Sequence, residues 1–423
     1  MLKDKKIILG ITGGIAAYKA AELTRQLVKG GAEVKVVMTR HAREFITPLT
    51  MQTLSGGPVF IDMYDTIKEF EIAHIALADY ADLFVIVPAT ANVIGKIASG
   101  IADDLLTTTV LATRAPVLIC PAMNVNMYEN AIVQEQVRKL SGHGYHVLEP
   151  AAGELACGTS GKGRLPEIPQ ILEEIESLLT VKDLVDEHVL VTAGPTREPF
   201  DPVRFITNYS SGKMGYAVAT MARRRGATVT LVSGPVQLPI PAGVFHVSVS
   251  SAREMRDAVM AALPEATVVI KAAAVADYRP AVRQEQKIKK KDDDLTLKLE
   301  RNPDIIHEIG EKKEDRILVG FAMESEHLVE HAIGKMVAKN MDFIVANDVT
   351  KEGAGFQGDT NLITILDRDG EMQELPLMDK MEAAGVILDK VRETRERLRS
   401  QPDQKTESLL SLWKTAGGKS RLQ

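Results

Sequence analysis

The chain has 423 residues, of which 45% are hydrophobic and 26% are charged, and its formal net charge is -6. This length suffices for two buried cores, and the composition is typical of a globular protein in solution. Apolar runs fall short of the roughly 20 residues that span a membrane, and the first residues lead into a predicted strand and not into a signal peptide. The negative charge disfavours a nucleic-acid partner. We expect a cytoplasmic protein without membrane or nucleic-acid partners.

Strands and helices alternate through the first half of the chain. The expected strands are continuous apolar runs, and helical spacing fills most of the intervals between them. These strands are 7–12, 34–39, 83–88, 117–120 and 146–149. Continuous apolar strands that alternate with helices predict a parallel sheet with helices on both faces.

The residues that come after these strands matter most, because ligands of such sheets bind at the carboxyl ends of the strands. Thr12, Gly13 and Gly14 follow the first strand, PATAN (88–92) follows the third and PAMN (121–124) the fourth. The first turn lacks the third glycine of the dinucleotide fingerprint, and the second strand ends in Thr39 and Arg40 without an acidic residue. The turn therefore fits a mononucleotide phosphate better, and a tight turn without a ligand is the alternative.

Two further side chains are candidates for chemistry. His74 lies in a predicted helix among apolar residues, a position that also suits an ordinary core histidine. Cys157 lies in the glycine-rich segment GELACGTSGKGRL, where Lys162 and Arg164 would favour its thiolate. A linker with an incidental thiol is the alternative for this segment. The only other cysteine is Cys120, so a disulfide framework and a four-thiolate metal site are excluded.

The second half repeats the alternation, and the boundary between the halves is expected near 181–186. The expected strands are 189–193, 228–233, 244–249, 268–273, 317–321, 343–346 and 362–366. We therefore predict an α/β protein with two doubly wound, Rossmann- or flavodoxin-like parallel-sheet domains in tandem. The predicted domains are 1–182 and 183–400, followed by a poorly ordered tail at 401–423.

A second small-residue turn follows the first strand of the second half. In the stretch VLVTAGPTREPFDPVRFITNYSSGKMG, Gly194 ends the strand and SSGKMG leads into a helix, so unpaired N–H groups could receive a phosphate. The match to a P-loop fails at Thr207 and Met214. Farther along, the charged segment 281–301 predicts an exposed hairpin or a flap that grips phosphate, and a solvated charge run is the alternative.

These motifs resemble two known enzyme families. GITGGIAAYK, His74, PATAN, PAMNVNMY and Cys157 resemble the flavin-dependent cysteine decarboxylases, although Val93 departs from the pattern. TAGPTREPFDPVRFITNYSSGKMGYAVA, AAAVADYRP, KIKK, NPDII, GFAMES and VANDV resemble phosphopantothenate–cysteine ligase. The order and spacing are similar to those of the bacterial bifunctional enzymes that make 4'-phosphopantetheine for coenzyme A.

The first resemblance implies FMN as cofactor. Decarboxylation of a cysteine amide needs an electron sink, and oxidation of the thiol by the flavin would supply one. The resemblance assigns His74 as base or orienting group, Asn124 to the substrate carboxylate and Cys157 as proton donor. It places these residues around FMN: Gly13, Gly14, Ile15, Thr39, Pro88, Ala89, Thr90 and Asn92.

The second resemblance implies CTP, accompanied by Mg²⁺ with unassigned ligands, because a carboxylate must be activated before an amine can displace its oxygen. Asn208 would help to turn over the acyl-cytidylate, and Lys287, Lys335 and Lys339 would face the triphosphate. The remaining nucleotide contacts implied are Gly194, Ala272, Ala273, Asp277, Pro303, Asp304, Ile305, Ile306 and Phe321.

The partners implied are small molecules, namely 4'-phosphopantothenate, cysteine and CTP. The resemblance also implies a homo-oligomer with trimeric contacts in the decarboxylase half and dimeric contacts in the ligase half. Two other interpretations are open. One is a flavin oxidoreductase fused to a nucleotide-binding domain. An NAD-type domain would require the dinucleotide fingerprint, which this sequence lacks. The other is a nucleotide-sensing subunit without catalysis, which would have no use for Cys157.

Overall fold

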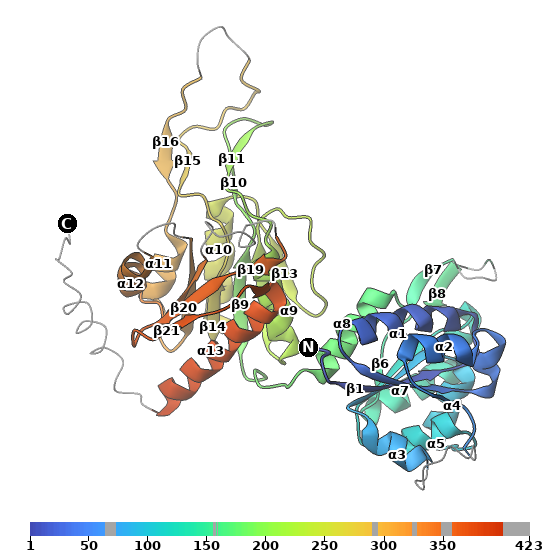
Figure 1. The fold of residues 1–423 in the computed structure, drawn as a ribbon. Coiled ribbons are helices and arrows are strands. Elements are labelled where there is room, and N and C mark those ends of the chain that lie inside the picture. Colours follow the sequence, from blue (N-terminus) through green and yellow to red (C-terminus); the bar gives the residue numbers. More distant parts are fainter. Residues whose placement is uncertain are drawn as a thin grey trace. The chain divides into compact units, whose positions relative to one another are not determined.

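A computed structural model describes residues 1–63, 73–154, 158, 160–289, 295–323, 328–347 and 358–400. The chain divides into two units, Met1–Val181 and Lys182–Gln423 (Figure 1). The tail at 401–423, for which poor order is predicted, lies outside the described residues.

The first unit is built on a six-stranded parallel sheet. From edge to edge the strands are β3 (Val59–Phe60), β2 (Glu33–Met38), β1 (Lys6–Ile11), β4 (Leu83–Ala89), β5 (Val117–Pro121) and β6 (His146–Val147). The five strands expected from the sequence are all present. This order puts the topological switch point between β1 and β4, where the carboxyl ends of the two strands open a crevice.

Helices cover both faces of this sheet because consecutive side chains of each strand point to opposite faces. Ile7 and Leu9 of β1 belong to one buried cluster, and Ile8 belongs to the other. The first face is covered by α1 (Lys19–Lys29), α2 (Pro48–Ser55) and α8 (Ile168–Leu179). The second face is covered by α3 (Ala73–Tyr80), α4 (Ala91–Ala98), α5 (Leu105–Ala112) and α7 (Ala131–Gly142).

Shorter elements carry the connections at the crevice. These are the 3-10 helices η1 (Ile15–Tyr18) and η2 (Arg40–Glu44), helix α6 (Val125–Glu129) and the antiparallel hairpin of β7 (Ala151–Glu154) and β8 (Ser160–Arg164). The sequence predicts one helix from residue 15, and the structure begins it with a separate 3-10 turn. The hairpin was not predicted, because its glycine-rich strands lack the alternation of polar and apolar residues that marks a strand.

The second unit is built on an eight-stranded sheet with the same central order. Its strands are β13 (Phe245–Ser248), β12 (Thr228–Ser233), β9 (His188–Ala193), β14 (Val268–Lys271), β17 (Ile317–Met323), β18 (Phe343–Asn347), β20 (Ile363–Asp367) and β21 (Met372–Glu374). The first six are parallel, and the predicted doubly wound core is therefore present with its switch point between β9 and β14. The predicted strand at 362–366 is present as β20, but it pairs antiparallel with β18, and β21, which was not predicted, pairs antiparallel with β20.

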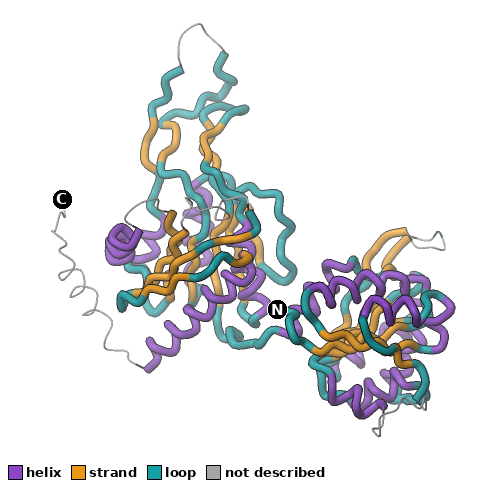
Figure 2. Tube along the Cα trace, in the orientation of Figure 1, coloured by secondary structure: helices purple, strands orange, loops and turns teal. Residues whose placement is uncertain are grey.

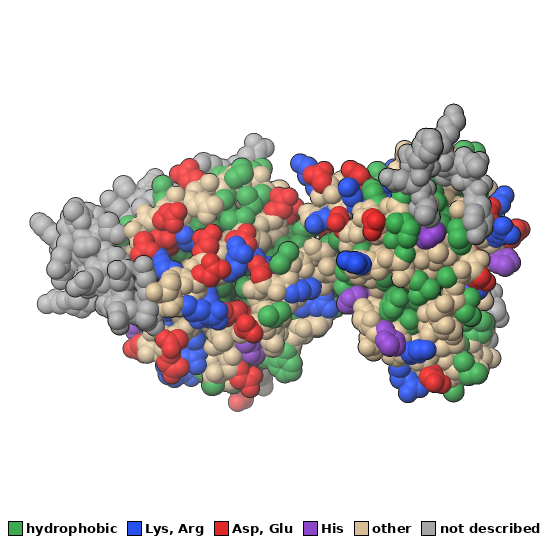
Figure 3. Space-filling model, turned by 90° about the horizontal axis from the view of Figure 1, so that it is seen from below, with side chains coloured by type: hydrophobic (Ala, Val, Ile, Leu, Met, Phe, Trp, Pro, Cys, Tyr) green, Lys and Arg blue, Asp and Glu red, His purple; other side chains and the backbone are tan. Residues whose placement is uncertain are grey.

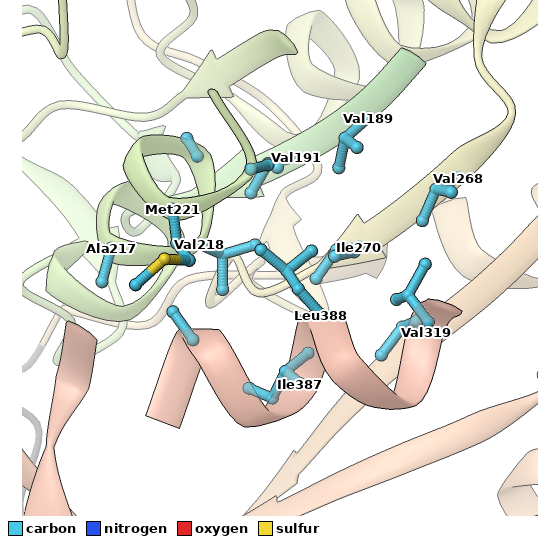
Figure 4. Close-up of a cluster of buried hydrophobic side chains, with 14 of the residues drawn as sticks. Val189, Val191, Ala217, Val218, Met221, Val268, Ile270, Val319, Ile387 and Leu388 are labelled. Carbon is cyan, nitrogen blue, oxygen red and sulfur yellow. The ribbon is translucent and has the colours of Figure 1, made fainter. Parts of the chain in front are cut away.

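Two layers of helices also enclose this second sheet. On one face α9 (Lys213–Arg224) and α13 (Lys380–Ser400) pack on β9, β14 and β17, as Figure 4 shows for Val218, Ile387 and Leu388. The other face carries α10 (Ala252–Ala262), which η3 (Leu263–Glu265) continues, together with α11 (Ile305–Glu311) and α12 (Leu328–Ala338). Val268 and Ile270 of β14 point to the first face and Val269 to the second.

Two hairpins project from the second unit and form what we call the arm (Figures 1 and 2). They are β10 (Arg197–Pro199) with β11 (Phe205–Thr207), and β15 (Tyr278–Pro280) with β16 (Leu299–Arg301). The second hairpin agrees with the expected hairpin at 281–301, whose residues 290–294 lie outside the described part. A small pair, β19 (Thr360–Asn361) with β22 (Met378–Asp379), precedes α13.

Candidate active sites of the two units

A cavity of about 1570 Å³ lies in the first unit, at the carboxyl ends of the strands. Of the residues predicted to hold the cofactor or substrate, it is lined by Gly13, Gly14, Ile15, Thr39, Thr90, Asn92 and Asn124. These residues come from the turns after β1, β2, β4 and β5, which are far apart in sequence. The volume exceeds that of an ordinary ligand pocket, so a mononucleotide and a second molecule would fit together.

One hydroxyl group joins the two strands at the switch point. Thr12 is fully buried, donates a hydrogen bond to the carbonyl of Pro88 at 2.7 Å and accepts one from the backbone N–H of Thr90 at 3.1 Å. The turn after β1 is thereby fixed to the turn after β4. This link fixes the turns after β1 and β4 relative to each other. Thr12 itself does not line the cavity, so the side chains that do line it remain available to a ligand.

Gly13 is required by a close approach of two turns. A Cβ atom at this position would lie 2.6 Å from the Cβ of His41 and 3.0 Å from its carbonyl carbon. At Gly14 the nearest atom would be Cγ2 of Thr90 at an ordinary 3.5 Å. The predicted pair of glycines is therefore unequal, because only the first is enforced by sterics.

The cavity wall also contains a polar atom that has no hydrogen-bond partner among the described residues. Oγ1 of Thr39 is buried without a hydrogen-bond partner among the described residues, and Thr39 lines the cavity. A buried hydroxyl without a partner is costly, so it is commonly satisfied by a ligand or by water. Together with the close turn at Gly13, this hydroxyl fits the FMN shell that the sequence predicts.

Charged side chains at the cavity are largely paired. Lys96 donates to Asp103 at 2.7 Å and lies 3.5 Å from Asp104. The hydrogen bond to Asp103 raises the pKa of Lys96. Arg40 pairs with Asp62 at 2.7 Å. The pairing keeps the wall close to neutral, so neutral and anionic parts of a ligand can both lie against it.

Asn124, which the resemblance assigns to the substrate carboxylate, lies in the cavity wall. It caps helix α6, its Oδ1 accepts the N–H of Asn126 at 2.9 Å, and it lines the cavity. The residue before it is fixed by a hydrogen bond from the N–H of Met123 to the carbonyl of Gly163 in β8 at 3.0 Å. The β7–β8 hairpin is thus attached to the asparagine turn.

The same hairpin adds cavity residues that sequence reasoning missed. Glu154, Gly163 and Arg164 line the cavity, and Arg164 also pairs with Glu167 at 3.1 Å. Their position could not be read from the sequence, because the antiparallel pairing of two glycine-rich strands was not foreseen. Cys157 itself lies outside the described residues.

Three predicted residues of the first unit do not line the cavity. Pro88 and Ala89 are in the end of β4, where Ala89 accepts the N–H of Ala122 at 3.0 Å. His74 is half-buried in α3, and its Nδ1 is buried without a partner among the described residues. The structure therefore gives Pro88 and Ala89 a supporting position, and it does not bring His74 to Asn124.

In the second unit some of the predicted nucleotide residues lie at the equivalent switch point. Gly194 follows β9 with a φ of 74°, and its carbonyl accepts the N–H of Ala274 at 2.9 Å. A Cβ at Gly212, which caps α9, would lie 3.4 Å from Cα of Gly194. The turns after β9 and β14 and the N-terminus of α9 are therefore in contact, with Ala272 and Ala273 beside them.

Farther along the same edge, α11 and α12 bring opposite charges together. Asp304 caps α11 by accepting the N–H of His307, and it pairs with Lys339 at 2.9 Å. Burial opposes its ionisation, but the hydrogen bond and charge of Lys339, the N–H of His307 and the charge of Lys271 together outweigh burial and lower the pKa of Asp304. Lys335 lies one turn before Lys339, as predicted.

The other predicted residues of this site differ in exposure. Ile305 and Ile306 are buried under the sheet, Pro303 and Phe321 are half-buried, and Asp277 is exposed at the base of the arm. Asp277 is fixed through its carbonyl, which accepts the N–H of Asn302 at 2.8 Å. The two isoleucines can therefore offer a ligand only their backbone.

Asn208 and Lys287 lie on the arm side of the second unit. The side-chain amide of Asn208 donates to the carbonyl of Val275 at 3.2 Å, which joins it to the turn after β14. Lys287 is exposed, and no contact among the described residues joins it to Asn208 or to Lys339. The structure thus brings Asn208 to the nucleotide turns and leaves Lys287 apart.

The segment that carries Lys287 is held by a pair that sequence reasoning missed. Asp201 accepts the N–H of Ile288 at 3.2 Å, and Arg204 donates to the carbonyl of Ile288 at 3.0 Å. Asp201 and Arg204 also pair with each other at 2.6 Å. The DPVR sequence gives no sign of this, because its partner is 87 residues away.

Within the described ranges, no helix is long and apolar enough to cross a membrane, and no group of three or more His, Cys, Asp or Glu side chains could hold a metal ion. On the face shown in Figure 3, acidic and basic side chains are interspersed.

The chain matches two family models. One, described as Flavoprotein, matches residues 1–180, and the other, described as DNA/pantothenate metabolism flavoprotein C-terminal domain, matches residues 184–394. The coenzyme A biosynthesis bifunctional protein CoaBC of Bacillus subtilis (strain 168) is 50% identical over 395 residues, which cover 92% of this chain and 97% of that protein. CoaBC of Escherichia coli (strain K12) is 45% identical over 395 residues, with the same coverage.

A solved structure of the C-terminal domain of CoaBC is 44% identical to this chain in sequence. The match covers 51% of this chain and 98% of that one, with a TM-score of 0.45.

Proposed function

Because the chain belongs to the family of coenzyme A biosynthesis bifunctional proteins CoaBC, we propose that it joins 4'-phosphopantothenate to cysteine and then decarboxylates the product to 4'-phosphopantetheine. The observation that carries this proposal is the coincidence of two family models with the two units of the chain. The ligation is assigned to the second unit and the decarboxylation to the first. A flavin oxidoreductase with an NAD-type domain is not favoured by these relatives.

In the first unit we assign FMN to the cavity at the β1–β4 switch point. Gly13, Gly14 and Thr39 would hold it, and the unpaired hydroxyl of Thr39 supports this choice. A bound flavin would supply a reversible two-electron acceptor for the substrate thiol. Asn124 would orient the substrate carboxylate for loss of CO2, and its attachment to the β7–β8 hairpin supports that role.

Cys157 would donate the proton that completes the product, and His74 would act as base or orienting group. In the sequence, Cys157 falls between the two strands of the hairpin that lines the cavity, which supports access to the substrate. His74 is outside the cavity lining, so its role requires a contact that the described residues do not provide.

In the second unit we assign CTP and Mg²⁺ to the β9–β14 switch point. The triphosphate would receive backbone N–H groups of the glycine turns and the charges of Lys287, Lys335 and Lys339. Asn208, which is anchored on the turn after β14, would lie beside the carboxylate that becomes the acyl-cytidylate. Cysteine would then displace CMP through its amine.

We also propose that the protein is a homo-oligomer. The arm exposes large apolar side chains, among them Val203 at 58%, Val282 at 68% and Tyr278 at 48%. Exposed apolar groups that gather on one projecting element are typical of an interface. A second copy of this chain is the occupant that the resemblance implies.

The test is a reconstitution with purified protein. Incubation with 4'-phosphopantothenate, cysteine, Mg²⁺ and either CTP or ATP should release pyrophosphate with CTP, and CO2 should follow in equal amount. Omission of cysteine should stop CO2 release. Failure to release pyrophosphate with CTP would contradict the ligase assignment, and pyrophosphate without CO2 in the flavin-loaded protein would contradict the decarboxylase assignment.

A further inference from the structure

A lysine that is not among the predicted site residues lies at the carboxyl end of β14, a central strand of the second unit. Lys271 is the last residue of β14 and directly precedes the predicted nucleotide residue Ala272. It pairs in register with Thr192 of β9 on one side and with Gly320 of β17 on the other. It therefore occupies the switch point itself, where ligands of doubly wound sheets bind.

The register determines the face from which this lysine emerges. Residues paired across parallel strands point to the same face of the sheet. A Cβ atom at Gly320 would lie 3.2 Å from Cδ1 of Ile306 in α11 and 2.3 Å from the sulfur of Met341. Lys271 must therefore emerge beneath α11 and α12. The absent side chain at Gly320 leaves room for the lysine stem on this face.

The charges around Lys271 balance in number but leave its ammonium group without a partner of its own among the described residues. Asp304 and Asp277 attract its ammonium group, and Lys339 repels it. Asp304 is already paired with Lys339 at 2.9 Å. Within the described part of the chain, Nζ of Lys271 forms neither a hydrogen bond nor an ion pair.

Lys271 is half-buried, and its ammonium form is less favoured here than in an exposed lysine. Withdrawal from water and the nearby Lys339 lower the pKa of Lys271 to about 8. A lysine that served only the fold would gain from a fixed carboxylate partner, or from replacement by an apolar residue. The arrangement is instead suited to an anion that arrives from outside and gives the ammonium group of Lys271 a direct partner.

We propose that Lys271 is a nucleotide-binding residue of the second unit, and that its side chain takes up a proton from solvent as a phosphate group of the nucleotide binds. This rests on the proposed function, since it requires CTP at this site. The bound phosphate would favour the ammonium form, so nucleotide affinity becomes dependent on pH in the alkaline range.

The experiment measures CTP binding to the full-length protein by calorimetry in the presence of Mg²⁺, at about pH 7.5 and about pH 9, which lie on either side of the pKa of Lys271. The wild-type dissociation constant should rise about fivefold or more between these values, because the empty site has lost its proton at the higher pH. Lys271→Arg should bind with little pH dependence, since arginine stays protonated. Lys271→Met should bind weakly at both pH values.

Two controls separate binding from folding. Lys312→Met removes an exposed lysine at the opposite end of α11 and should keep the wild-type affinity and pH dependence. Lys271→Met removes an unpaired ammonium, so the Tm of its unliganded form at neutral pH should be equal to or above that of wild type. If Lys271→Met nevertheless fails to fold, Lys271→Arg provides the test: CTP binding with little pH dependence supports the role of Lys271, and the wild-type pH dependence contradicts it.

Proton uptake gives a second readout that a structural role would not change. Near pH 9, the measured binding enthalpy of wild type should vary with the ionisation enthalpy of the buffer, and that of Lys271→Arg should not. A wild-type pH dependence retained by both variants would overturn the role of Lys271 while leaving CTP binding intact. Absence of CTP binding to the wild type at either pH would overturn the proposed function as well.

Discussion

Gly13 is the residue of the first site whose requirement is purely steric. The sequence shows two adjacent glycines after a strand, and these look equivalent. Only the structure distinguishes them, because the turn that carries His41 lies against Gly13 and comes from η2, after the next strand. A contact between segments this far apart cannot be deduced from a local turn pattern.

We predict that Gly13→Ala impairs flavin binding and Gly14→Ala preserves the fold. The added methyl at residue 13 would lie 2.6 Å from Cβ of His41, and relief of that overlap would cost about 1–3 kcal/mol and displace the turn. The flavin-to-protein ratio after gel filtration and the Tm of the apoprotein measure the two effects. A Gly13→Ala protein that retains the wild-type ratio would show that the turn can move without loss.

Among the elements, the central strands and their helices were predictable because each carries its own signal. Continuous apolar runs identified β1, β4, β9 and β14, and helical spacing placed helices in most of the intervals between the strands. The antiparallel end of the second sheet was not foreseen. The turn between β20 and β21 contains Asp369 and Gly370, with φ of 82° at the glycine, which is a hairpin signal that went unused.

The arm is the element for which sequence reasoning was least complete. Its two hairpins are joined by Asp201 and Arg204, which hold the backbone of Ile288. Burial opposes the ionisation of Asp201, but hydrogen bonds from Arg204 and from three backbone N–H groups outweigh it and lower its pKa. The stabilisation is therefore complete above the pKa of an unfolded aspartate and is lost as pH falls through the lower folded value.

We predict that Asp201→Ala releases the segment that carries Lys287. Loss of these hydrogen bonds should make local opening easier by roughly 1–2 kcal/mol, which corresponds to about five- to thirtyfold faster trypsin cleavage of the Lys287–Ile288 bond. Mass spectrometry of that one bond at neutral pH provides the measurement. Asp257→Ala, which removes an exposed acid paired with Arg256 at 3.0 Å, is the matched control. Equal cleavage of the two variants would mean that Asp201 does not hold the segment.

At the scale of the whole molecule, the two units are self-contained. Each of the four buried clusters lies within one unit, and each unit has its own switch point with its own turn residues. The same strand order thus serves two chemistries, and the difference lies in the turns after the strands. These turns carry glycines around a cavity in the first unit, and glycines with nearby lysines in the second. The fold explains where the sites are, and the side chains explain what they do.

This independence predicts that two inactive variants complement each other in a mixture. Gly13→Ala should still release pyrophosphate from CTP and accumulate phosphopantothenoylcysteine, because its altered turn is in the first unit. Asn208→Asp should form amide slowly, because a carboxylate in place of the amide repels the carbonyl of Val275, and it should decarboxylate added phosphopantothenoylcysteine at the wild-type rate. Neither variant alone should convert 4'-phosphopantothenate to 4'-phosphopantetheine efficiently.

In an equimolar mixture, the product of one protein must leave its site and diffuse to the other. We therefore expect 4'-phosphopantetheine to appear after a lag, during which phosphopantothenoylcysteine accumulates, and then at a rate that rises with the concentration of Asn208→Asp. Mass spectrometry of both compounds over time provides the measurement, with wild type showing a shorter lag. A mixture that stays inactive although each half-reaction works alone would mean that the intermediate passes between sites without release, and that the units do not act independently.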